Sequence, residues 1–138
     1  MKQEELNEIL RLHKAWLHQE EGGEQANLQG ADLRHADLHG KKLWDVSLHR
    51  VNLCHVDMRG ADIDYASWPL WCGSLKAYVD DRIAIQLLYH TLSVVQYSPY
   101  VSEEVKKALL SEENVRIANR FHRVGECGEI KEWEEGTK

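Results

Sequence analysis

A large aliphatic or aromatic residue recurs at every fifth position between residues 26 and 70. The periodic residues are Leu28, Leu33, Leu38, Leu43, Leu48, Leu53, Met58, Ile63 and Trp68. A small or aliphatic residue mostly stands two positions before each of them. A step of five advances about 140° around an α-helix and alternates between the faces of a flat strand, so neither element gathers these residues on one side. The pattern therefore predicts a chain that turns between repeats and buries the large residues by stacking successive turns.

Helical periodicity flanks the repeat on both sides. Residues 3 to about 19 carry apolar side chains at spacings of three and four, which predicts an amphipathic helix stopped by Gly22-Gly23. Residues 82–96 are apolar nearly all round, which is typical of a helix that is buried or lies in an oligomer interface.

The C-terminal part shows two helix-start signals followed by an acidic tail. Ser102 and Ser111 each precede two glutamates, which predicts N-caps for two short helices, the second ending at about Arg123. After Gly125, glutamates surround Trp133 with few other apolar residues. Such a composition indicates a tail that is disordered or ordered only by a partner.

The five-residue units share a common motif. Residues 26–30, 31–35, 36–40 and 61–65 each read alanine, aspartate or asparagine, a large aliphatic residue, and two variable residues. This motif resembles that of the pentapeptide-repeat family. The resemblance implies a right-handed, four-sided β-helix with one repeat per side, in which the large residue and the small one point inward. Trp68 then fills the last core position, either as an aromatic plug or as a surface on which a ligand stacks.

The expected fold is of the α+β class, with a short pentapeptide-repeat β-helix of about two coils between helical caps. Its parts are an N-terminal capping helix (1–25), the repeat solenoid (26–70), a C-terminal helical cap (71–124) and the acidic tail (125–138). The stretch from Trp68 into the apolar helix is also similar to the C-terminal half of small pentapeptide-repeat proteins of bacteriophages and prophages. That group has no shared activity that the resemblance would imply.

Composition and charge narrow the classes of function. The chain of 138 residues has a net charge of −6. Residues 26–70 are nearly neutral, with six acidic and five basic residues. We therefore expect no direct binding to nucleic acid. No run of about 18 apolar residues predicts a membrane span, and the acidic N-terminus lacks a signal-peptide core. Cys54, Cys72 and Cys127 lack a CxxC spacing and indicate free thiols in a reducing cytoplasm. The resemblance to phage and prophage proteins implies that this cytoplasm is that of a bacterial host.

Catalytic and metal-binding patterns are sparse. Four repeats per turn would place residues twenty apart over one another, so His35 lies over His55 beside Cys54. Imidazole and thiolate suit zinc, but a fourth ligand is not evident, and solvent-facing histidines are the alternative interpretation. No nucleophile motif, glycine-rich phosphate loop or HExxH sequence is present. We therefore expect neither an enzyme nor a cofactor.

Trp44 is the strongest candidate for a partner contact. It takes an outward position of the repeat, and large exposed aromatic residues near charges are typical of binding hot spots. Packing of Trp44 beneath the N-terminal helix is the alternative. The predicted partner-binding residues are Trp44, Lys42, Asp45, Asp64, Tyr65 and Trp133.

These observations favour a non-catalytic protein–protein interaction module. The resemblance to the wider pentapeptide-repeat family, some of whose members mimic DNA to occupy topoisomerases, implies an inhibitor of a host enzyme of nucleic-acid metabolism, such as a CRISPR effector or a topoisomerase. The second resemblance implies that this inhibitor is of phage or prophage type. The near-neutral repeat argues against mimicry of duplex DNA in particular. One alternative is an assembly scaffold that forms a homodimer through residues 82–96. Another is a small-ligand (nucleotide) binding protein that uses the aromatic end near Trp68 and Trp71.

Overall fold

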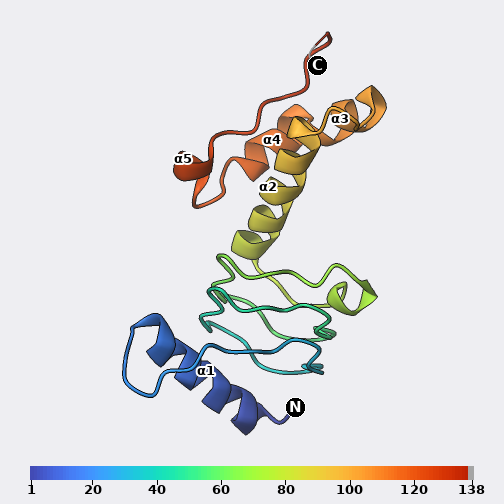
Figure 1. Ribbon diagram of the computed structural model, residues 1–138. Coiled ribbons are helices and arrows are strands. Elements are labelled where there is room, and N and C mark those ends of the chain that lie inside the picture. Colours follow the sequence, from blue (N-terminus) through green and yellow to red (C-terminus); the bar gives the residue numbers. More distant parts are fainter. Residues whose placement is uncertain (137–138) are drawn as a thin grey trace. The chain divides into compact units, whose positions relative to one another are not determined.

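The computed structural model describes residues 1–136, and the chain separates into two compact units after Asp80 (Figure 1). Unit 1 is Met1–Asp80, and unit 2 begins at Asp81. Unit 1 contains helix α1 (Gln3–Leu17), the repeat and a short 3₁₀ helix, η1 (Cys72–Ser74). The helices of unit 2 are α2 (Asp81–Tyr97), α3 (Glu103–Leu109), α4 (Glu112–Ala118) and α5 (Val124–Cys127).

Helix α1 buries one face and lies against the first turn of the repeat (Figure 1). Its buried residues are Leu6, Leu10 and His13, at the spacing of three and four that the sequence shows. At its start, Gln3 bonds both backbone groups of Asp37, with the Gln3 Nε2 donating at 3.0 Å and the Asp37 N–H donating at 2.9 Å. Hydrogen bonds to the backbone thus fix the start of α1 on the repeat.

The end of α1 differs from the prediction. The helix ends at Leu17, and Gln19 takes a left-handed φ of 57°. The Glu20 N–H then donates to the Ala15 carbonyl at 2.9 Å, which together with this conformation makes a Schellman stop with glutamine in place of glycine. Gly22-Gly23 is therefore not the stop.

Gly23 has a different role, because a Cβ there would lie 2.4 Å from the backbone nitrogen of Trp16. Only glycine lets the returning chain pass this close to the end of α1.

Residues 26–70, called the repeat segment below, form turns that stack with a fixed offset. Isolated parallel bridges join residues twenty apart, namely Asn27 with Ser47, Asp32 with Asn52, Asp37 with Asp57, Lys42 with Asp62, and Ser47 with Ser67. Every fifth residue has a positive φ, at Gly30, His35, Gly40, Asp45, Arg50, His55, Gly60 and Tyr65. Stacking continues past the repeat, because Tyr78 forms a further bridge with Asp57.

The predicted α+β class with a four-sided β-helix is wrong for the described residues. Helices make up 39% of residues 1–136, and the 7% of these residues in β pairing form neither a strand nor a sheet. The left-handed residue that closes each five-residue unit turns the chain after a single bridge, so consecutive residues never pair. The terms β-helix and solenoid therefore do not describe the repeat segment.

The periodic residues nevertheless form the core of unit 1. Eight of the nine, from Leu28 to Ile63, are at most 6% exposed. Val46, Val51 and Val56 are buried in the second register although they are larger than alanine. Trp68 departs from the prediction, because it is only half-buried and does not complete the core.

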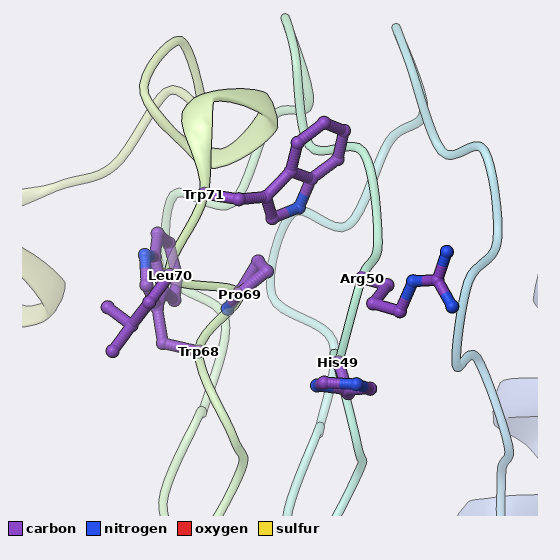
Figure 2. A pocket seen from close by; sticks show the side chains of 6 residues that line it. All are labelled: His49, Arg50, Trp68, Pro69, Leu70 and Trp71. Atoms are coloured by element: carbon purple, nitrogen blue, oxygen red, sulfur yellow. The ribbon is translucent and has the colours of Figure 1, made fainter.

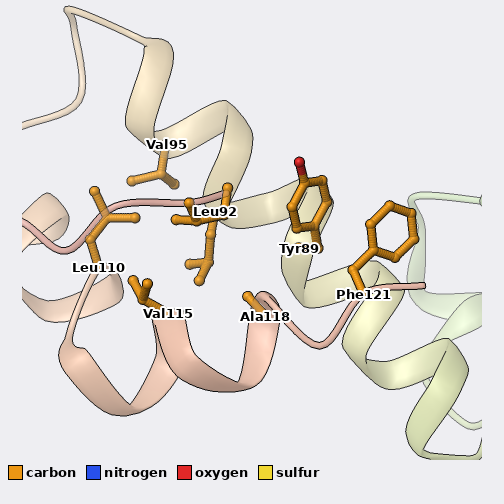
Figure 3. Close-up of a cluster of buried hydrophobic side chains, with 8 residues drawn as sticks. Tyr89, Leu92, Val95, Leu110, Val115, Ala118 and Phe121 are labelled. Carbon is orange, nitrogen blue, oxygen red and sulfur yellow. The ribbon is translucent and has the colours of Figure 1, made fainter. Parts of the chain in front are cut away.

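Unit 2 is a small helical unit with its own core (Figure 3). The buried cluster consists of Tyr89, Leu92, Val95, Leu110, Val115, Ala118, Phe121 and Ile130. The predicted N-caps are confirmed, because the Ser102 hydroxyl accepts from the Val105 N–H and the Ser111 hydroxyl from the Asn114 N–H. None of the helices in residues 1–136 has the length and apolar character needed to cross a membrane.

The tail also differs from the prediction, because Ile130 and Trp133 anchor it within unit 2. The Asn119 side chain bonds both backbone groups of Ile130, at 2.8 and 2.9 Å, and Ile130 is 3% exposed. The backbone N–H of Trp133 donates to the Leu110 carbonyl at 3.0 Å. Helix α4 consequently ends at Ala118 instead of Arg123, where Asn119 begins to serve the tail. The last two residues of the predicted tail lie outside the described residues.

Candidate interaction surface

Four of the predicted partner contacts meet at one corner of the repeat segment. The rings of Trp44 and Tyr65 pack edge to face with centroids 5.4 Å apart, and the Asp45 N–H donates to the Asp64 carbonyl at 3.4 Å. The Trp44 carbonyl accepts from His13 Nε2 at 2.6 Å, so α1 packs against this corner and leaves the Trp44 side chain half-buried. Tyr65, which is 65% exposed, and the exposed Asp45 are the parts of the corner that a partner can reach.

The remaining predicted contacts have different surroundings. Lys42 is exposed and pairs through its backbone with Asp62. The side chain of Asp64 is not on the surface, since the residue is 4% exposed. Trp133 belongs to unit 2, where it packs beside the hydrophobic cluster with the Lys107 ammonium 5.8 Å from its ring centroid. Fewer of the predicted residues are therefore available to a partner at this corner than the sequence suggested.

The histidines expected to lie over one another do so. The rings of His35 and His55 stack with centroids 5.0 Å apart, and His55 Nδ1 bonds the Tyr78 hydroxyl at 2.8 Å. Cys54 is a half-buried free thiol beside them. Among residues 1–136, no group of three or more histidine, cysteine or acidic side chains is arranged to hold a metal ion. Stacked imidazoles present their faces to each other, so they do not converge on a common point as ligands would.

The aspartates of the repeat serve its backbone and neighbouring arginines. Asp32 accepts from the Arg34 N–H at 3.1 Å and forms a salt bridge with the Arg34 guanidinium at 2.6 Å, and Asp57 and Arg59 repeat this arrangement. The bonds from Arg34 lower the pKa of Asp32 to about 2, and those from Arg59 hold the pKa of Asp57 still further below its usual range. A general base needs a pKa near the working pH, so these carboxylates are unsuited to proton transfer.

A shallow groove of about 280 Å³ lies on unit 1 (Figure 2). It is lined by His49, Arg50, Trp68, Pro69, Leu70 and Trp71. The twenty-residue offset brings the two parts of this lining together, since residues 49 and 50 precede residues 69 and 70 by one turn. No acidic side chain lines the groove.

Trp71 is fixed in place although it is exposed. Its Nε1 donates to the Val51 carbonyl at 2.9 Å, and its ring covers Gly73, where a Cβ would lie 2.2 Å from the indole. The residue is still 46% exposed, and the neighbouring Leu70 is 94% exposed. The same end of unit 1 also exposes Leu75, at 78%, and Tyr78, at 52%. Within its lining, the groove therefore combines an immobilised aromatic ring with the highly exposed Leu70.

Sequence reasoning identified part of this groove and missed the rest. It marked Trp68 and Trp71 as an aromatic end, but it did not include His49, Arg50 or Leu70. The twenty-residue offset that places His35 over His55 also places His49 and Arg50 beside residues 69 and 70, so the sequence does contain a signal for this lining.

Comparisons with known proteins leave the chain without an assigned relative, because no family model, no curated protein and no solved structure matches it. The resemblance to pentapeptide-repeat proteins therefore rests on the sequence motif alone.

Proposed function

We propose that this protein is a non-catalytic module that binds another protein through the groove of unit 1 and the apolar residues around it. The observation that carries this proposal is the pairing of the immobilised Trp71 with the almost fully exposed Leu70. A large apolar side chain that stays exposed to water gains no burial energy. An aromatic residue that is already held in one conformation binds a partner with little loss of rotamer freedom. Such residues dominate the energetics of protein interfaces.

The proposed partner is a host enzyme that acts on nucleic acid, in the cytoplasm of a bacterial host. The motif resemblance supports this class of partner, with a CRISPR effector or a topoisomerase as the leading examples. The net charge of −6 favours contact with the protein part of such a complex over contact with nucleic acid. Binding then inhibits the enzyme by occupying its surface and requires no chemistry from this chain.

The test compares three tagged proteins in affinity purification from phage-infected bacterial lysate. They are the wild type, Leu70→Asp and the matched variant Tyr100→Asp, which places the same charge at another fully exposed apolar residue, 95% exposed. We expect the wild type and Tyr100→Asp to retain one nucleic-acid enzyme that Leu70→Asp loses about tenfold or more, since a charge buried without a partner is costly.

The recovered enzyme is then assayed for activity with increasing amounts of each protein. Inhibition by the wild type and Tyr100→Asp, but not by Leu70→Asp, supports the proposal. Recovery of no such enzyme, together with no effect in gyrase supercoiling and CRISPR nuclease assays, contradicts it.

A homodimeric scaffold is a second candidate, which α2 supports. No acidic or basic residue occurs from Ile83 to Tyr97 except His90. Within this stretch Val94 is 70% and Tyr97 is 78% exposed. An uncharged exposed helix side of this kind is compatible with a second copy of itself.

A further inference from the structure

We propose that the groove of unit 1 receives an acidic peptide segment in which a carboxylate side chain neighbours a large aromatic or aliphatic residue. This inference rests on the proposed function and specifies the chemistry of the partner at that same site. It combines two features of the groove, its apolar wall and its basic edge.

The apolar wall selects a large side chain. Trp71 is held by its bond to the Val51 carbonyl and by contact with Gly73, so its exposed surface does not have to be ordered on binding. Trp68 and Pro69 continue the wall along the chain, and Leu70 projects outward at its rim (Figure 2). An aromatic or branched aliphatic side chain placed here removes apolar area from water on both partners.

The basic edge selects a carboxylate. Arg50 is exposed and, within residues 1–136, has no carboxylate partner. The other three arginines of unit 1 each form a salt bridge with an acidic residue two or three positions away, Arg11 with Glu8, Arg34 with Asp32, and Arg59 with Asp57. With His49 beside it and no acidic side chain in the lining, Arg50 gives the groove an unbalanced positive charge. A guanidinium binds a carboxylate with two parallel hydrogen bonds.

The openness of the site favours a peptide over a free small molecule. A small ligand needs most of its surface covered, whereas the rim residue Leu70 is 94% exposed and Trp71 is 46% exposed. A side chain that belongs to a larger chain needs less cover, because the rest of the segment contributes contacts outside the groove. A nucleic-acid strand needs a row of cations along its phosphates, and the groove supplies one arginine and one histidine.

The acidic tail of this chain is not the proposed occupant. It contains Trp133 among glutamates, but the Trp133 backbone bonds to the Leu110 carbonyl and its ring packs beside the hydrophobic cluster. Occupying the groove would require these contacts to break, so a separate chain fits better.

The test uses fluorescence anisotropy with short fluorescein-labelled peptides and the full-length protein. The probe has the sequence Gly-Glu-Glu-Phe-Glu-Gly. One matched peptide replaces each glutamate with glutamine, and the other replaces the phenylalanine with alanine. We expect the probe to bind wild-type protein more tightly than either matched peptide, and we expect its affinity to fall as salt is added.

The protein variants separate the two features of the groove. Arg50→Asn removes the charge while keeping a residue that tolerates the left-handed φ of 59° at this position. It should weaken the acidic probe about three- to fivefold, the range of one exposed ion pair, and leave the glutamine peptide unaffected. The control Arg34→Asn removes an arginine that is already paired with Asp32 and should change neither affinity. Leu70→Asp should weaken the probe by a larger factor, and circular dichroism verifies that each variant is folded.

Several results would overturn this inference. One is equal binding of the glutamate and glutamine peptides, and another is an equal effect of Arg50→Asn and Arg34→Asn. Displacement of the probe by adenosine monophosphate or by a single-stranded oligonucleotide would assign the groove to another class of ligand. If the peptides fail while Leu70→Asp still loses the enzyme from lysate, the protein-binding function stands and only the acidic-peptide inference is rejected.

Discussion

His13 is a buried polar residue that ties α1 to the repeat segment. Its side chain is 0% exposed, its Nε2 donates to the Trp44 carbonyl at 2.6 Å, and its Nδ1 accepts from the Ala26 N–H at 3.1 Å. These two bonds select the neutral tautomer that carries its proton on Nε2. A histidine on the apolar side of a helix is thus explained by the two backbone groups of the repeat segment that it bonds.

We expect His13→Leu to lower the free energy of unfolding by about 1–3 kcal/mol, because it removes the two hydrogen bonds through which His13 joins α1 to the Trp44 carbonyl and the Ala26 N–H. Urea unfolding followed by circular dichroism measures this change. The control His18→Leu lies on the following turn with its side chain 48% exposed, and it should change stability by less than about 0.5 kcal/mol. An equal loss of stability in the two variants would contradict the role of His13 in joining α1 to the repeat segment.

The salt bridge between Asp32 and Arg34 makes the folding stability depend on pH in acid. The hydrogen bonds from Arg34 lower the pKa of Asp32 to about 2, so the ionised carboxylate is favoured in the folded state. A depressed pKa contributes stability above the ordinary aspartate pKa of about 3.9, and that contribution is lost as the pH falls through about 2. Both partners are about half exposed, which limits the size of the effect.

We expect Arg34→Gln to raise the pKa of Asp32 toward its ordinary value, but not fully, since the bond from the backbone N–H at position 34 remains. The stability difference between this variant and the wild type should shrink as the pH falls from about 4 to about 2. Carboxyl carbon NMR titration measures the pKa directly. Asp57, which keeps Arg59, serves as the internal reference and should still titrate below the usual range of aspartate pKa values.

At the residue scale, the sequence predicted contacts that follow from the offset of twenty and missed contacts that depend on exposure. The stacking of His35 on His55 required only arithmetic. That Trp71 is exposed while the periodic leucines are buried depends on how the chain leaves the last turn through η1, which no local pattern encodes. Arg50, by contrast, differs from Arg34 and Arg59 in a way that the sequence does show, because it lacks an acidic residue two positions earlier.

At the scale of elements, the stop of α1 is built on an unfavourable residue. Gln19 occupies the left-handed position of the Schellman motif with φ 57°, a conformation that costs about 1 kcal/mol for residues with a Cβ. We expect Gln19→Gly to raise the free energy of unfolding by about 0.5–1 kcal/mol in a urea titration. The control Gln29→Gly changes a glutamine whose φ is not positive and should be neutral or destabilising. A loss of stability at position 19 would contradict the assignment of the stop.

The elements that the sequence predicted well are those fixed by local chemistry. Ser102 and Ser111 start their helices because their hydroxyls accept from N–H groups three residues ahead. The elements that failed depend on distant groups. Helix α4 ends where Asn119 binds Ile130, eleven residues later. The β-helix failed for a third reason, because a five-residue period predicts stacking but leaves open whether one residue or several pair on each side.

At the scale of the whole molecule, the exposed side of α2 sets a limit on self-association. A stable dimer buries about 800 Å² on each partner through 20 to 30 residues. One side of a 17-residue helix, with Val94 and Tyr97 as its largest exposed residues, supplies only part of this area. Any dimer that uses α2 alone must therefore be weak.

We expect the mass measured by light scattering to stay near 16.0 kDa in dilute solution and to rise toward twice this value at protein concentrations of about 100 µM or more. Val94→Glu should abolish the rise, because two copies of the new charge would face each other across a symmetric contact. The matched control Val105→Glu changes a residue of α3 that is 42% exposed and should leave the rise intact. A mass that stays at 16.0 kDa at the highest concentration would remove the scaffold alternative and leave the groove of unit 1 as the proposed interaction surface.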